Sequence, residues 1–272
     1  MPEISRGTSS IQRVALVTGA ARGIGAAVVR RLAADGYRVI AFDWCAGEES
    51  PAGYPQATRA DLDALLASLP AGSALPYVGD VRDASALRAA VELACTTWGR
   101  LDAVVAGAAV IAGGTPAWDP TARDDLDLLW EVDVRGVWNT AAAAVPAMLA
   151  GPSPQGCRFV AIASAAGSHG LFRLTGYTAA KHAVVGLVRG LAADLVGTGV
   201  SAVAVSPGST STSMLRATAD IYGVTTAELA GHQLLRRELD PDEVAATVAL
   251  CCSVDGAALN GSVVHADGGF GG

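Results

Sequence analysis

Short apolar runs alternate with longer amphipathic stretches along most of this chain. Runs typical of buried strands occur at residues 13–18, 37–43, 75–79, 101–106, 158–164, 201–206 and 262–266. Between them, apolar residues recur at helical spacing over residues 25–35, 84–98, 123–149 and 177–196. Strands that are apolar throughout and alternate with helices indicate a parallel sheet with helices on both faces. The pattern therefore predicts an α/β fold built on a doubly wound parallel sheet.

Two segments depart from the simple alternation of strand and helix. Residues 45–74 are rich in Gly, Pro and Glu and contain one helical stretch at 59–69, which predicts an elaborated crossover between strands. Residues 209–239 are expected to form a flap over the substrate. The last helix follows this flap, because the run Asp240–Glu243 (DPDE) places Asp at the N-cap, Pro at N1 and Glu at N3.

Composition narrows the class of protein. We expect residues 1–12, which are polar, to form a flexible tail before a single domain at 13–272. Neither a signal peptide nor a membrane-spanning run is recognisable, and the net charge of −7 argues against nucleic-acid and anionic-membrane partners. Five cysteines without CxxC spacing indicate reduced thiols, and four scattered histidines suggest no metal site. The expectation is a cytoplasmic protein.

The first predicted strand runs into a glycine-rich turn, TGAARGIG at residues 18–25, and then into a helix. Glycines in such a turn let the backbone approach a pyrophosphate, and the helix N-terminus supplies free N–H groups and a positive dipole end. The spacing is GxxxGxG rather than GxGxxG, so the turn alone is a weak signal for nucleotide binding. The residues of this turn that we expect at a cofactor are Gly19, Arg22, Gly23, Ile24 and Gly25.

Acidic residues stand at the ends of the second and third predicted strands. Asp43 ends the second strand, where a carboxylate accepts hydrogen bonds from the adenosine ribose hydroxyls and repels the 2′-phosphate of NADP. NAD is therefore the expected cofactor, although Arg22 in the turn is placed to contact a phosphate and tempers this preference. Asp80 and Val81, at the end of the third strand, are expected to line the adenine pocket.

Three residues further along carry candidate chemistry. Ser164 ends a predicted strand, and Tyr177 and Lys181 lie four residues apart on a predicted helix, so the phenol and the ammonium share one helix face. A nearby ammonium lowers a tyrosine pKa from about 10 toward the pH at which a general acid or base works best. A YxxxK pair alone occurs by chance on many helices. Together with the glycine turn and Ser164, it indicates hydride transfer between a nicotinamide and a substrate.

In their order along the chain, these motifs resemble those of the short-chain dehydrogenase/reductase family over residues 13–270. The matching pieces are TGAARGIG, Asp43, Asp80–Val81, Ser164, Tyr177-Thr-Ala-Ala-Lys181, Pro207–Gly208 and the DGG at 267–269. The resemblance implies a single Rossmann-like domain with about seven parallel strands. It implies an NAD-dependent alcohol dehydrogenase or carbonyl reductase with Tyr177 as acid and base and Lys181 on the nicotinamide ribose. It also implies cofactor contacts from Ala106, Gly107, Pro207, Gly208 and Thr212.

Two departures from the family pattern stand out. The usual Asn-Asn-Ala-Gly after the fourth strand is replaced by the run Ala106–Ala109 (AGAA), which keeps backbone contacts but loses side-chain hydrogen bonds. The family's catalytic Asn aligns with Asp133, which can still accept a hydrogen bond from a water that bridges to Lys181. If ionised, Asp133 would partly neutralise Lys181 and raise the pKa of Tyr177. Asn139 is a competing candidate in the wrong helical register.

Finer features resemble the mycofactocin-associated members of the family, among them the long crossover at 45–74, TAAKHAVVGLVRGLAADL at 178–195 and HADGGF at 265–270. This resemblance implies a tightly held NAD that stays bound through turnover and is reoxidised by mycofactocin, a peptide-derived redox carrier. The family resemblance also implies a homo-oligomer, with a tetramer favoured, that assembles through helices 123–149 and 177–196.

The substrate side is predicted to be apolar. The residues expected to line it are Met214, Leu215, Ile221, Tyr222, His232, Leu234 and Leu235 in the flap, and His169, Leu171 and Phe172 after the catalytic Ser. A hydrophobic, secondary alcohol and its carbonyl are therefore the expected substrates. Two alternatives stay open: an NADPH-dependent ketoacyl-type reductase, against which Asp43 argues, and a catalytically silent nucleotide-binding scaffold, against which the intact Ser164, Tyr177 and Lys181 argue.

Overall fold

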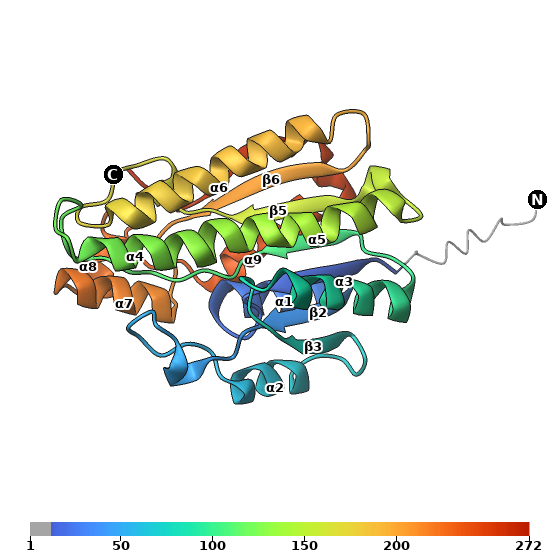
Figure 1. Ribbon diagram of the computed structural model, residues 1–272, viewed down its shortest axis with the longest axis horizontal. Coiled ribbons are helices and arrows are strands. Elements are labelled where there is room, and N and C mark those ends of the chain that lie inside the picture. Colours follow the sequence, from blue (N-terminus) through green and yellow to red (C-terminus); the bar gives the residue numbers. More distant parts are fainter. Residues whose placement is uncertain (1–11, 272) are drawn as a thin grey trace, which may run out of the picture.

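Seven parallel strands form one sheet in the computed structural model, which describes residues 12–271 (Figure 1). The strands are β1 (Val14–Thr18), β2 (Arg38–Asp43), β3 (Ala74–Val78), β4 (Ala103–Ala106), β5 (Arg158–Ile162), β6 (Ser201–Pro207) and β7 (Val263–Ala266). Their order is β3-β2-β1-β4-β5-β6-β7, so the chain reverses its direction of travel between β1 and β4. The predicted doubly wound fold is confirmed. The expected tail lies, apart from Gln12, outside the described residues, as does Gly272.

Helices cover both faces of the sheet. They are α1 (Gly23–Ala34), α2 (Arg59–Ala67), α3 (Ala84–Trp98), α4 (Ala122–Leu129), α5 (Gly136–Ala150), α6 (Thr175–Asp194), α7 (Ser213–Tyr222), α8 (Thr226–Ala230) and α9 (Pro241–Cys252). The side chains of β1 alternate between two cores: Val14 and Leu16 pack in the core that includes α3, α5 and α6, and the intervening Ala15 and Val17 pack in the core that includes α1, α2 and α9. Within residues 12–271, no helix has the length and apolar character needed to cross a membrane.

The predicted helix at 123–149 is wrong in one respect, because it consists of three pieces. Between α4 and α5 lies a π-helical segment, η2 (Trp130–Arg135), and the three pieces run almost end to end in Figure 1. A π-helical turn is wider than an α-helical turn and shifts the register of the residues that follow. Asp133 lies inside η2 and is fully buried. The register shift therefore occurs at a charged residue that points into the protein.

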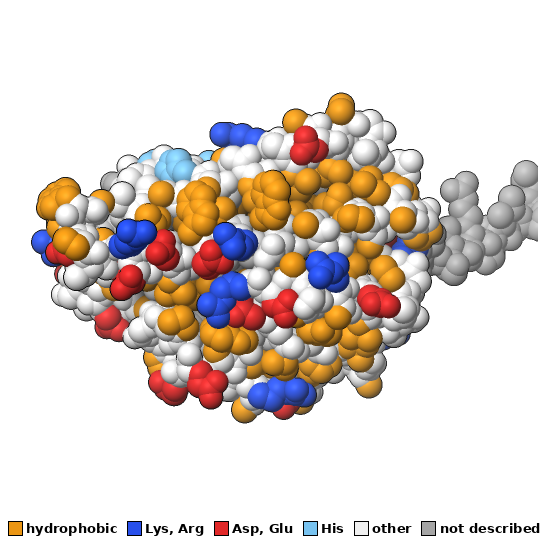
Figure 2. Space-filling model, viewed as in Figure 1, with side chains coloured by type: hydrophobic (Ala, Val, Ile, Leu, Met, Phe, Trp, Pro, Cys, Tyr) orange, Lys and Arg blue, Asp and Glu red, His pale blue; other side chains and the backbone are white. Residues whose placement is uncertain are grey.

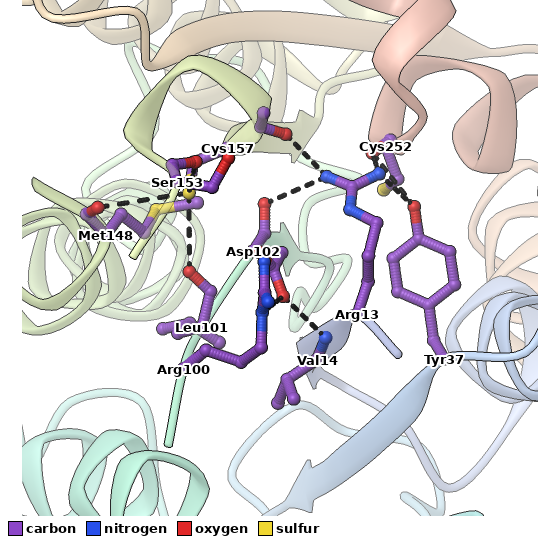
Figure 3. Close-up of polar contacts among 11 residues, drawn as sticks. Arg13, Val14, Tyr37, Arg100, Leu101, Asp102, Met148, Ser153, Cys157 and Cys252 are labelled. Atoms are coloured by element: carbon purple, nitrogen blue, oxygen red, sulfur yellow. Dashed lines mark hydrogen bonds and ion pairs between the residues drawn. The ribbon is translucent and has the colours of Figure 1, made fainter. Parts of the chain in front are cut away.

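A buried polar network joins the amino-terminal ends of the central strands, opposite the edge where ligands bind in such sheets (Figure 3). Arg13 donates to the carbonyl oxygens of Cys252 (2.8 Å) and Gly156 (2.5 Å) and to the phenol of Tyr37. The Asp102 carboxylate accepts hydrogen bonds from Val14 N at 2.8 Å and from the guanidinium of Arg100. These contacts attach the end of α9 to β1 and β4.

Arg158 belongs to the same end of the sheet and is 2% exposed. Its guanidinium donates to the carbonyl oxygens of Ser253 and Val254, just past α9, and of Gln155 and Cys157. Carbonyl groups at the end of a helix lack partners within the helix, so a buried cation there satisfies several acceptors at once. The other end of α9 has the predicted cap, because Asp240 and Glu243 form a capping box around Pro241.

Candidate active site

A long cavity opens at the carboxyl ends of the strands and collects most of the residues that the sequence predicts. The predicted residues that line it are Gly19, Arg22, Gly23, Ile24, Gly25, Asp43, Asp80, Val81, Gly107, Ser164, Tyr177, Lys181, Pro207, Gly208 and Thr212. Two of the predicted cofactor-binding and catalytic residues do not line this cavity. Ala106 is buried at the end of β4, and Asp133 is buried behind the cavity wall.

The glycine turn brings backbone very close to backbone. A Cβ on Gly25 would lie 1.9 Å from Gly19 O, and a Cβ on Gly19 would lie 2.8 Å from Ala108 N. Among the described residues, no side chain caps the N-terminus of α1, so its first N–H groups are left to face the cavity. The geometry is that of an anion-binding turn. Arg22 also lines the cavity, and its guanidinium donates at 2.7 Å to Pro55 O in the crossover.

The Asp43 carboxylate is held at the end of β2 by two backbone N–H groups, of Ala21 and Cys45, both at 2.9 Å. It lines the cavity beside the glycine turn, as predicted. Near the end of β3, the Asp80 carboxylate pairs with Arg82, whose guanidinium lies 4.7 Å above the Trp44 ring. The pairing of Asp80 with Arg82 is local and was not evident from the family pattern.

The loop after β4 keeps a side-chain tether in spite of its AGAA sequence. The Thr18 hydroxyl, at the end of β1, accepts hydrogen bonds from Gly107 N (3.1 Å) and Ala108 N (3.2 Å). The loop and the glycine turn are therefore joined across the point where the strand order reverses. The loop lacks the asparagine side chains of the family pattern, but the Thr18 hydroxyl of the neighbouring strand holds its backbone in place.

Ser164, Tyr177 and Lys181 meet in the cavity, as the spacing predicts. Ser164 follows β5 and accepts a hydrogen bond from Ala166 N at 3.1 Å, while Tyr177 and Lys181 share a face of α6. The Lys181 ammonium lies 5.5 Å from the centre of the Tyr177 ring. Burial raises the pKa of Tyr177; Lys181 lowers it, Asp133 raises it again, and a hydrogen bond with Ser164 lowers it, with a net rise. The directions predicted from the sequence agree with this balance, because Lys181 lowers the pKa of Tyr177 and Asp133 raises it; burial of the tyrosine, which is 6% exposed, makes the largest contribution.

Asp133 contacts Lys181 directly, with 2.9 Å between Oδ2 and Nζ, and both side chains are buried. Its other oxygen accepts a hydrogen bond from Val110 N at 2.9 Å. The expected bridging water is therefore replaced by an ion pair. Burial alone lowers the pKa of Lys181, but the neighbouring carboxylate raises it and the net direction is upward. Asn139 faces elsewhere and donates to the carbonyl oxygens of Val81 and Arg82.

The apolar end of the cavity only partly matches the prediction. The predicted residues Leu171, Met214 and Leu215 line it, and the Tyr177 hydroxyl lies 3.9 Å from the Met214 sulfur. The predicted residues that do not line it are His169, Phe172, Ile221, Tyr222, His232, Leu234 and Leu235. Residues that the sequence did not point to take their place: Tyr54, Ile111, Leu128, Leu174, Thr218 and Phe270. Most of these come from other segments, so no local pattern could identify them.

The crossover loop, which we define as residues 44–58, forms one side of the cavity. Its lining residues are Trp44, Cys45, Ala46, Ser50, Pro51, Tyr54, Gln56 and Ala57. The Tyr54 hydroxyl accepts a hydrogen bond from Ile111 N at 3.3 Å, and Arg22 holds Pro55 O. An antiparallel bridge between Ala46 and Thr58 closes the base of the loop. The loop is thus attached to two opposite walls of the cavity.

Comparison with known proteins identifies the family. A family model described as enoyl-(acyl carrier protein) reductase matches residues 19–271. The chain belongs to the short-chain dehydrogenase/reductase family. An uncharacterized NAD-dependent oxidoreductase of Mycobacterium tuberculosis is 34% identical over 97% of this chain and 98% of its own. The (-)-trans-carveol dehydrogenase of Rhodococcus erythropolis is 37% identical over 75% of this chain and 73% of its own. The crystal structure of levodione reductase matches with a TM-score of 0.80, 29% identity and coverage of 94% and 96%.

Membership in the short-chain dehydrogenase/reductase family agrees with the fold and with the predicted resemblance, and it makes this chain one of a family of oxidoreductases. The ion pair between Asp133 and Lys181 involves a carboxylate at a position where the family pattern carries Asn. It is therefore the feature that sets this site apart from the pattern.

Proposed function

We propose that this protein is an NAD-dependent oxidoreductase that interconverts a hydrophobic secondary alcohol and its carbonyl by hydride transfer. The observation that carries the proposal is the meeting of Ser164, Tyr177 and Lys181 with an apolar cavity end at the carboxyl edge of the sheet. The names of two relatives, a carveol dehydrogenase and an NAD-dependent oxidoreductase, support the same assignment.

The residues present fit a dinucleotide. The close backbone approach between Gly19 and Gly25 leaves room for a pyrophosphate at the start of α1, and Asp43 lies where ribose hydroxyls need an acceptor. The carboxylate at this position disfavours a 2′-phosphate, which supports NAD over NADP. Lys181 would hold the nicotinamide ribose, and Thr212, the N-cap residue of α7, the carboxamide. When bound, NAD supplies the hydride acceptor in the oxidation.

Tyr177 is the proposed acid and base. In alcohol oxidation its phenolate takes the hydroxyl proton of the substrate, and in carbonyl reduction its phenol returns that proton. Lys181 stabilises the phenolate by its charge, and Ser164 binds the substrate oxygen by a hydrogen bond. Asp133 touches neither the cavity nor the substrate. It acts through Lys181, so it is a positioning residue rather than the catalytic residue that the alignment predicts.

The cavity end beside Tyr177 supports an apolar substrate. Leu171, Leu174, Met214 and Phe270 line it, and Arg22 and Lys181 are the cations among the described lining residues. The family model's description names an acyl-carrier substrate, which the alternative of an NADPH-dependent ketoacyl-type reductase would also use. Asp43 and the lack of a basic cluster at the apolar end of the described cavity argue against this alternative. Turnover with NAD compared with NADP separates the two.

We further propose that the cofactor is held tightly. The crossover loop closes one side of the cavity and is tied to Ile111 and to Arg22, so a bound dinucleotide would lie under it and leave only when these contacts break. Reoxidation by mycofactocin stays a prediction. Native mass and absorbance of the dialysed protein test retention: retained NAD or NADH is expected, and a clean apo-protein would contradict it.

A homo-oligomer is also proposed. The face formed by α4, η2, α5 and α6 carries a band of hydrophobic side chains in Figure 2, and exposed apolar residues on these elements include Leu126, Trp130, Trp138 and Leu149. Exposed apolar surface of this kind favours association. Light scattering coupled to gel filtration measures the mass, for which a tetramer is expected and a monomer would contradict the proposal.

Activity is tested with secondary alcohols, NAD and a dye acceptor, in the presence and absence of added cofactor. Oxidation is expected, with loss of at least about 100-fold in Tyr177→Phe, since a positioned acid and base contributes that much. Tyr222→Phe is the matched control, because this phenol is outside the cavity and donates to Phe172 O. Equal activity of Tyr177→Phe and the parent protein would reject the mechanism and revive the silent-scaffold alternative.

A further inference from the structure

The C-terminal segment turns back to place an aromatic ring in the wall of the cavity. After β7, Gly269 adopts a φ of +77°, and the next residue, Phe270, lines the cavity. A residue with a side chain is disfavoured at such a φ, and a Cβ on Gly269 would lie 2.9 Å from the Leu234 side chain. The DGG sequence thus forms a turn that brings Phe270 into the cavity wall, beside His169 of the segment after Ser164.

Phe270 is held from two sides. The chain around it pairs with residues 232–235: Leu234 N donates to Gly269 O at 2.9 Å, and Gly271 N donates to His232 O at 3.2 Å. The ring itself lies between two histidines, 5.6 Å from the centre of His169, which follows Ser164 and its short helix, and 6.4 Å from the centre of His232.

A buried glutamine attaches this paired segment to the sheet. Gln233 is fully buried; its Oε1 accepts a hydrogen bond from Ser209 N at 2.8 Å, and its Nε2 donates to Arg237 O. Ser209 follows β6 directly, beside Pro207 and Gly208 of the predicted cofactor edge. These hydrogen bonds hold the backbone that carries Phe270, so they limit the positions that its ring can take in the cavity wall.

We propose that Phe270 determines substrate specificity and favours a cyclic alcohol or ketone over an open-chain one. A fixed aromatic face packs against the broad face of a saturated ring over a large area, whereas a flexible chain must lose torsional freedom to lie flat against it. This inference rests on the proposed function, because it assigns the substrate class of the same site.

The test compares cyclohexanol with hexan-2-ol, two secondary alcohols with six carbons. Calorimetry on NAD-loaded Tyr177→Phe protein measures binding without turnover. Adding Phe270→Ala is expected to weaken cyclohexanol binding about tenfold and hexan-2-ol binding about twofold. Phe270→Leu, which keeps apolar bulk without the ring, is expected to recover hexan-2-ol binding only. Phe172→Ala is the matched control, since that ring is 74% exposed and outside the cavity.

With Tyr177 intact, the ratio of kcat/KM for cyclohexanol to that for hexan-2-ol is expected to fall about fivefold in Phe270→Ala and about tenfold in Phe270→Leu. Equal losses for the two alcohols, or no binding of either, would overturn the inference. Ring-selective binding without oxidation of either alcohol would instead reject the proposed function and leave the role of Phe270 intact. Circular dichroism of each variant checks that the fold is retained.

Discussion

Replacing Asp133 by Asn is the sharpest test of how this site sets its proton affinity. The substitution removes a negative charge 2.9 Å from the Lys181 ammonium but leaves one oxygen, which can still accept the hydrogen bond from Val110 N. Burial and Asp133 both raise the pKa of Tyr177, and Lys181 opposes them. Without the carboxylate, the ammonium acts on the phenol unopposed, so the pKa of Tyr177 should fall.

The size of the effect follows from the distances. A full charge 5.5 Å from the Tyr177 ring centre, at an effective dielectric constant of about 20, stabilises a phenolate by about 3 kcal/mol, which is about two pH units. In the parent protein the adjacent carboxylate cancels much of this stabilisation. We therefore expect the apparent pKa of Tyr177 to fall by about one to two pH units in Asp133→Asn.

The assay is the pH dependence of kcat/KM for alcohol oxidation. The phenolate is the active base, so the rate is high above the apparent pKa and falls as the pH drops below it. The parent protein should therefore have an alkaline optimum, and the rising limb of Asp133→Asn should move toward neutral pH. Asp127→Asn, an exposed position in α4, should leave the profile unchanged. Superimposable profiles for Asp133→Asn and the parent would refute the reasoning.

Three other predictions concern the cofactor and the fold. Asp43→Ser removes the carboxylate that disfavours a 2′-phosphate, so the ratio of kcat/KM with NADP to that with NAD should rise at least about tenfold. An unchanged ratio would contradict the role of Asp43. Asp35→Ser, at an exposed helix end, is the control. Tyr54→Phe removes the acceptor for Ile111 N, so NAD should leave the dialysed protein about fivefold faster; equal release rates would show that this contact does not retain the cofactor. Arg158→Met leaves buried carbonyl oxygens without donors and should lower the free energy of unfolding in urea by about 3 kcal/mol. Arg123→Met, at an exposed helical position, should change the free energy of unfolding little. A similar stability for both variants would argue against a stabilising role of the Arg158 contacts.

Much of this protein follows from local sequence patterns. The strands, α3, α6 and the cap of α9 lie where period and capping residues predict, because these signals act over a few neighbouring residues. Tyr177 and Lys181 share a face because positions i and i+4 do so on any α-helix. Strand ends meet at one edge in a parallel sheet, which is why Asp43 and Ser164 also reach the cavity.

The tertiary structure decided the rest. The π-helical turn at η2 has no periodic signature in the sequence. Asp133 lies in this turn and is buried against Lys181, forty-eight residues further along the chain. The two side chains contact each other directly, whereas the family resemblance implies a bridging water. Tyr54 and Phe270 reach the cavity from the crossover loop and the C-terminal turn, through hydrogen bonds to residues distant in sequence. Such contacts depend on the path of the loops and on which buried groups find partners. Sequence alone therefore determined the sheet and the proposed catalytic set, and packing determined the charge beside Tyr177 and the shape of the cavity.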